Sequence, residues 1–73
     1  MAQMFHIDLS SLSTHKERYE VRNLLNSHGF DINEHWISID ETNKTIDYLQ
    51  AFWSYTSPPK FPELPVGVKI ISL

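Results

Sequence analysis

The stretch THKERYEVRNLLNSHGF, residues 14–30, carries the start signal, the apolar stripe and the stop signal of one helix. Thr14 and Glu17 have the spacing of a capping box, in which the Thr14 side chain accepts a hydrogen bond from the Glu17 amide and Glu17 reaches back to the Thr14 amide. Gly29 can adopt the left-handed conformation that ends a helix. At 100° per residue, one side is lined by Val21, Leu24, Leu25 and His28. The pattern predicts an amphipathic helix over residues 14–28.

Short runs that alternate between apolar and polar side chains predict strands on both sides of this helix. Residues 4–9, 36–40 and 66–73 alternate in this way, and residues 30–33 offer a very short additional strand. In the first run the apolar side is made of Phe5, Ile7 and Leu9. We expect that side to face the core.

Residues 43–55 admit two interpretations. Ile46, Leu49 and Trp53 recur at i, i+3 and i+7 after a polar break that can cap a helix, and this spacing favours a second helix. The alternative is a hairpin in which residues 45–49 pair back on the preceding strand. We expect the helix.

The predicted order of strand, helix, short strand, strand, helix and strand is that of a ferredoxin-like split βαβ unit. We expect an α+β sandwich in which two helices cover one face of a three- or four-stranded, mostly antiparallel sheet, with residues 1–73 as a single domain. Residues 57–65, which contain four prolines, are expected to form an irregular loop over one edge of the core. The open face of the sheet is predicted to carry His6, Asp8, Trp36, Ser38, Asp40, Lys69 and Ile71.

The charge of the chain argues against some classes of partner. Nine acidic and six dispersed basic residues give a net charge of −3, which disfavours nucleic acid as a ligand. The chain has no cysteine, so neither disulfides nor thiolate metal sites can support the core, and the cytoplasm is the expected compartment. No apolar run approaches the length of a membrane span. We expect neither a cofactor nor a membrane association.

The runs MFHIDL at residues 4–9, LLNSHGF at 24–30 and WISI at 36–39 resemble the small CRISPR-adaptation nuclease-like family and its relatives among toxin and antitoxin proteins. The resemblance covers roughly the first half of the chain. It implies that Asp8, the aspartate that ends the first strand, binds a metal ion used in the cleavage of RNA or DNA. This chain departs from the family in its proline-rich segment, which stands where the family leads more directly into its last strand.

Few residues are candidates for catalysis. His6 and Asp8 lie on one face of the first strand, where a histidine can act as a base and a carboxylate can orient it. Asp8 and Asp40 can hold a divalent cation if their strands are neighbours. Pairs of this kind also occur by chance on any polar sheet face, so we predict neither a catalytic residue nor a bound metal ion.

A second set of residues is typical of protein interfaces. Tyr19 and Arg22 share the exposed face of the predicted helix, and tyrosine and arginine are enriched at interface hot spots. Trp36 is predicted to stand on the open sheet face, near Asp8 and Asp40. These five residues form the predicted binding surface. The alternatives are a solvated helix face, and a tryptophan that packs against the long loop.

The sequence therefore predicts a small acidic protein-binding regulator that occludes a partner protein, in the manner of inhibitors, antitoxins or anti-defence factors encoded by phages and mobile elements. Two alternatives remain. One is a small metal-dependent nuclease that uses Asp8. The other is a structural subunit that forms homodimers or larger assemblies through an edge strand at residues 66–73.

Overall fold

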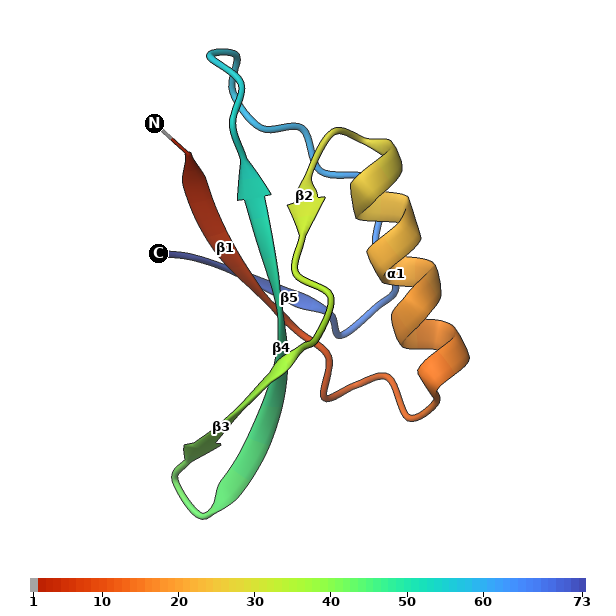
Figure 1. The fold of residues 1–73 in the computed structure, drawn as a ribbon. Helices are drawn as coiled ribbons and strands as arrows, with labels where there is room; N and C mark the ends of the chain where they lie inside the picture. Colours follow the sequence, from red (N-terminus) through yellow and green to blue (C-terminus); the bar gives the residue numbers. More distant parts are fainter. Residues whose placement is uncertain (1) are drawn as a thin grey trace.

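A computed structural model describes residues 2–73 as one α-helix and a five-stranded sheet (Figure 1). The elements in chain order are β1 (Gln3–Asp8), α1 (His15–Ser27), β2 (Asp31–Ile32), β3 (Ile37–Glu41), β4 (Lys44–Trp53) and β5 (Lys69–Ser72). All strand pairs are antiparallel. The chain is therefore a small α+β protein rich in strand. Met1, which the predicted single domain includes, lies outside the described residues.

The helix α1 begins and ends where the sequence predicts. Thr14 is its N-cap, and the Thr14 hydroxyl accepts a hydrogen bond from the Glu17 amide at 3.2 Å. The Glu17 carboxylate accepts from the Thr14 hydroxyl at 2.8 Å, whereas the capping box predicts the Thr14 amide as donor. At the other end Gly29 has a φ of 104°, and the Phe30 amide donates to the Leu25 carbonyl at 3.2 Å. This geometry is the Schellman motif.

The central strand of the sheet is β4. One of its edges pairs with β1, from Trp53 opposite Gln3 to Tyr48 opposite Asp8. Its other edge pairs first with β3, over Lys44–Tyr48, and then with β2. The last strand, β5, adds to the outer edge of β1. Three of the other four strands thus depend on β4 for their backbone partners.

The core lies between α1 and one face of the sheet (Figure 1). Val21 and Leu25 point from the helix into this layer, and both are buried. The remaining buried members of the cluster are Phe5, Ile7, Leu9, Leu12, Phe30, Leu49, Ala51 and Trp53. The predicted apolar side of the first strand is confirmed.

The predicted helix over residues 43–55 is wrong, and the hairpin interpretation is right. Glu41 pairs with Lys44, so Thr42 and Asn43 form a two-residue turn. Their φ angles are 42° and 70°, and positive φ at both central residues is the signature of a type I′ turn. Two consecutive left-handed residues cannot serve as the first turn of a right-handed helix, so the chain reverses and continues as β4.

The helical spacing in this segment arises because β4 is apolar on both faces. Ile46 and Tyr48 are buried on one face, while Leu49, Ala51 and Trp53 are buried on the other. A central strand with two buried faces has a nearly continuous apolar run, and such a run contains the i, i+3, i+7 positions of a helix by necessity.

The ferredoxin-like architecture is therefore also wrong. The described residues contain one helix instead of two, and the sheet has five strands. The place expected for the second helix is taken by irregular chain, residues 54–68, which runs from the end of β4 across the α1 side of the sheet to β5 (Figure 1).

This proline-rich segment covers one edge of the core, as predicted. Phe61 packs edge-on against Phe5, with ring centroids 5.1 Å apart, and stacks on Phe30 at 4.8 Å. Leu64 and Val68 are half-buried against the same cluster. The segment thus completes the layer that α1 begins.

No helix or loop of residues 2–73 packs on the face of the sheet opposite α1, which we call the open face, although Ile46 and Tyr48 are buried there by neighbouring side chains. His6 and Asp8 lie on this face as predicted, because they alternate with the core residue Ile7. Their cross-strand partners in β5, Ile71 and Lys69, share the same face.

The predicted faces of Trp36, Ser38 and Asp40 are wrong. Ser38 donates a hydrogen bond to Asp47 at 2.6 Å on the α1 side, and Asp40 shares that side of β3. Trp36 packs against α1, with its ring centroid 6.1 Å from that of Tyr19. The side chains that β3 places on the open face are those of Ile37, Ile39 and Glu41, which stand opposite Tyr48, Ile46 and Lys44. The alternation along β3 is as predicted, but its apolar side, Ile37 and Ile39, faces away from α1, where it packs beside Ile46 and Tyr48 of β4.

The turn between β3 and β4 generates a stability prediction. The double substitution Thr42→Asn, Asn43→Gly should raise the free energy of unfolding by about 1 kcal/mol, since Asn-Gly adopts two positive φ angles with less strain than a β-branched residue. Urea unfolding followed by circular dichroism measures the change. The control Thr56→Asn, at an exposed position after β4, should leave stability unchanged. A turn variant that is less stable than the wild type would contradict the type I′ turn.

Candidate functional site

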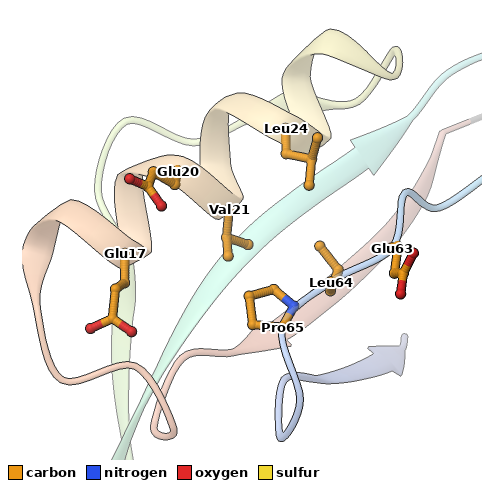
Figure 2. A pocket seen from close by; sticks show the side chains of 7 residues that line it. All are labelled: Glu17, Glu20, Val21, Leu24, Glu63, Leu64 and Pro65. Atoms are coloured by element: carbon orange, nitrogen blue, oxygen red, sulfur yellow. The ribbon is translucent and has the colours of Figure 1, made fainter.

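A groove of about 400 Å³ lies between α1 and the proline-rich segment. Figure 2 shows Val21 and Leu24 pointing from the helix toward Leu64 and Pro65 of the segment. The remaining lining residues are three carboxylates, Glu17, Glu20 and Glu63. We call these seven residues the acidic groove. Its four apolar residues form the floor, and its three carboxylates form a negatively charged rim.

The helical repeat places the α1 residues of the acidic groove on one side. Glu17 and Glu20 lie one turn before Val21 and Leu24, at i+4 spacing in each case. The opposite wall is held in place because Phe61 is anchored in the aromatic part of the core. Prolines fix the backbone φ angle on that wall, which limits its rearrangement.

The electrostatics of the acidic groove follow from its composition. No lysine or arginine is among the seven residues that line it. Glu20 and Glu63 are exposed, whereas Val21 is buried and Leu24 and Leu64 are half-buried. The groove therefore suits an apolar group flanked by positive charge.

A second cluster lies around Trp36. The ring centroids of Trp36 and His15 are 5.3 Å apart, and the Arg18 guanidinium lies 5.3 Å from the Trp36 ring centroid. Tyr19 packs beside Trp36, and Arg22 lies 5.9 Å from the Tyr19 ring. Three of the predicted binding residues, Tyr19, Arg22 and Trp36, are thus brought together. A hollow of about 290 Å³ next to them is lined by His15, Tyr19, Glu34, His35 and Trp36.

Arg18 connects this cluster to the sheet. Its Nη1 donates to Oδ2 of Asp47 at 2.8 Å, and its Nε donates to the carbonyl of Leu12 at 3.0 Å. The Ser38 hydroxyl also donates to Asp47, and together with the Arg18 guanidinium it holds the pKa of that carboxyl below its usual range. Arg18 is therefore a structural tie between α1, the chain before it and the β3–β4 hairpin.

The remaining predicted site residues are not brought together. Asp8 and Asp40 lie on opposite faces of the sheet, in strands that flank β4 on its two sides. The Asp8 carboxylate accepts a hydrogen bond from the Ser10 amide at 2.8 Å, as is typical of an Asx turn. The condition for a shared cation, that the strands of Asp8 and Asp40 are neighbours, is therefore not met. Across residues 2–73, no group of three histidine or carboxylate side chains is placed to hold a metal ion.

His6 has a structural environment on the open face. Its ring stacks on Tyr48 at 5.3 Å, and the Gln50 side-chain amide donates to its Nε2 at 3.2 Å. The Tyr48 hydroxyl donates to Glu41 at 3.1 Å. Burial raises the pKa of Tyr48 above its usual range, and the hydrogen bond to Glu41 acts in the same direction.

Comparison with protein-family models, with curated proteins and with solved structures finds no match to this chain. Within residues 2–73, no helix has both the length and the apolar character that a membrane span requires.

Sequence reasoning missed the acidic groove. The stripe of Glu17, Glu20, Val21 and Leu24 is visible in the sequence as a helical repeat, but its opposite wall is irregular chain about 40 residues later. No periodicity places Glu63 or Leu64 beside that stripe.

The Asp47 interactions generate a pH-dependent prediction. Asp47→Asn should lower the free energy of unfolding by about 1 kcal/mol at neutral pH, because it weakens a half-buried ion pair. The folded-state pKa of Asp47 lies below the ordinary value of 3.8, so this contribution is present above pH 3.8 and is lost as the pH falls through the folded-state pKa. Urea unfolding of both proteins across this range should show two stability curves that converge in acid. Asp40→Asn, an exposed carboxylate on β3, is the control, and a gap that persists in acid would contradict the assignment.

Proposed function

We propose that this chain is a small protein-binding regulator that acts by occupying a basic, partly apolar segment of a partner protein. The observation that carries the proposal is the acidic groove, in which half-buried Leu24 and Leu64 lie among three carboxylates. Such a site binds an apolar anchor residue and selects for lysine or arginine on either side of it.

The charge of the whole chain supports the same partner. A net charge of −3 steers a basic segment toward the protein, and it opposes association with nucleic acid phosphates. The carboxylates at the rim then favour the correct orientation of the bound segment. An electrostatic contribution of this kind weakens as the salt concentration rises.

The Trp36 cluster supplies a second contact area on α1. Tyr19 is 46 % exposed, and Trp36 is half-buried beside it. Tyrosine, tryptophan and arginine side chains that are already held by neighbours lose little conformational entropy on binding. A partner that contacts both this cluster and the acidic groove would cover α1, which is how a protein of this size can occlude a functional surface.

Binding to defined peptides tests the proposal. The probes are two fluorescent peptides of equal length, each with a central Leu-Ile pair, flanked by lysine and arginine in one and by glutamate in the other. The chain should bind the basic peptide and not the acidic one, and added salt should weaken the binding. Equal binding of both peptides, or binding of neither, would contradict the proposal.

Substitutions at the rim of the acidic groove test whether the basic peptide binds there. Glu20→Gln with Glu63→Gln should weaken binding of the basic peptide by roughly fivefold, because two rim charges are lost while shape is kept. Asp31→Asn with Asp40→Asn removes the same charge from exposed positions on β2 and β3 and is the matched control. If the control weakens binding as much as the groove variant, the net charge and not the groove determines the affinity.

A further inference from the structure

The strand β5 forms one edge of the sheet. It pairs with β1 alone and ends the strand order, so no other segment of residues 2–73 pairs with its outer side. All residues of β5 are exposed, whereas every other strand contains buried or half-buried residues. Ile70 and Ile71 of this strand, and Leu73 directly after it, are three of the six large hydrophobic residues that the described chain exposes. An exposed apolar edge of this kind is a template for pairing with another strand.

The hydrogen bonds between β1 and β5 show which backbone groups of the edge point outward. The Leu73 amide donates to the Met4 carbonyl at 3.0 Å, and these two residues continue the register of the two strands. In an antiparallel pair, hydrogen-bonded and non-hydrogen-bonded positions alternate. Leu73 and Ile71 therefore direct their N–H and C=O groups toward β1. Ile70 and Ser72 direct theirs outward, where an added strand can bind them.

The outer edge of β5 is complementary to a second copy of itself. A two-fold axis perpendicular to the sheet at Ile71 brings two β5 strands together in the antiparallel direction. Ile71 then stands opposite Ile71 of the second copy, and Ile70 stands opposite Ser72 of the second copy. Every outward N–H and C=O group of Ile70 and Ser72 is thereby paired, in both copies. The short strand needs no second sequence to complete its backbone hydrogen bonds.

The side chains of β5 fit the same register. Ile71 and its copy form a non-hydrogen-bonded pair, in which opposite side chains approach most closely. Lys69, the only charged residue of β5, stands at the start of the strand and opposite Leu73 of the second copy. The two lysines are then about 13 Å apart along the strand, which exceeds the screening length of about 8 Å at physiological salt. The self-paired edge therefore brings apolar side chains together and keeps like charges apart.

We propose that this chain forms a homodimer in which the β5 strands of two copies pair antiparallel about Ile71. The two sheets then become one continuous sheet, and β5 gains a backbone partner on each of its edges. The two-fold axis leaves α1 of both copies on the same face of that sheet. The residues that line the acidic groove all lie outside β5, so the dimer does not rest on the proposed function.

Proline at position 72 tests the backbone pairing. Ser72→Pro removes an outward N–H group and takes no hydrogen bond from the pairing of β5 with β1. Sedimentation equilibrium should give the wild type a mass of twice the 8.6 kDa of one chain. Ser72→Pro should raise the dissociation constant of the dimer about tenfold or more, because hydrogen bonds are lost at both symmetry-related positions. The control Ser72→Ala keeps the N–H group and should dimerise as the wild type does.

Cysteine substitutions test the register, because the chain has no cysteine of its own. Ile71→Cys places two thiols in a non-hydrogen-bonded pair with Cα atoms about 4.5 Å apart, a distance that a disulfide spans. Oxidation should therefore link the Ile71→Cys dimer. Ile70→Cys should stay unlinked, since its copy lies at a diagonal position about 8 Å away, beyond the reach of a disulfide.

Three results would overturn the proposal. One is a wild type that is monomeric at all concentrations, which would leave the edge to a strand from a different protein. Another is a Ser72→Pro variant that dimerises as tightly as Ser72→Ala. The third is disulfide formation by Ile70→Cys to the same extent as by Ile71→Cys. Circular dichroism reports whether each variant folds, and if Ser72→Pro does not fold, the two cysteine variants decide.

Discussion

The backbone pairing of β4 on both edges is the constraint on which the rest of this structure depends. β1 takes one edge, and β2 and β3 share the other, so the chain before and after α1 meets on a single strand. A strand in this position has backbone partners on both edges, and both of its faces are available for apolar side chains. The type I′ turn at Thr42 and Asn43 sets the register of β3 against β4. That register decides which side chains of the hairpin face α1 and which face away.

Because the described residues contain one helix, one face of the sheet is covered by a second layer and the other face is not. On one face α1 and the proline-rich segment bury the core, and the contact between them forms the acidic groove on the outer surface. On the other face apolar side chains are packed among themselves with no second layer in residues 2–73. The chain thus has an acidic outer surface on the α1 side, and a sheet face on the other side whose apolar side chains are interspersed with charges of both signs.

The side chains that first suggested chemistry have structural roles. Asp8 closes a turn after β1, and His6 is stacked on Tyr48. Asp47, which the sequence did not single out, ties Arg18 to the hairpin. Arg18 in turn lies on Trp36, so the cluster that resembles an interface hot spot is held rigid by an ion pair next to it. A cation shared by Asp8 and Asp40 requires the two carboxylates to meet, and the sheet separates them.

Local signals determined the helix, from the Thr14 cap to the Gly29 stop, together with the first strand and its buried side. These features follow from interactions between residues a few positions apart, so the sequence by itself specifies them. It also brought Tyr19 and Arg22 to one helix surface. The tertiary structure alone decided that residues 44–53 are a strand and that Trp36 faces the helix. It also decided that Glu63 and Leu64 complete a groove with α1. The reason is physical. A segment that is apolar on both faces satisfies the helical and the strand period equally, and only the backbone partners supplied by β1, β2 and β3 make the strand the lower free-energy state.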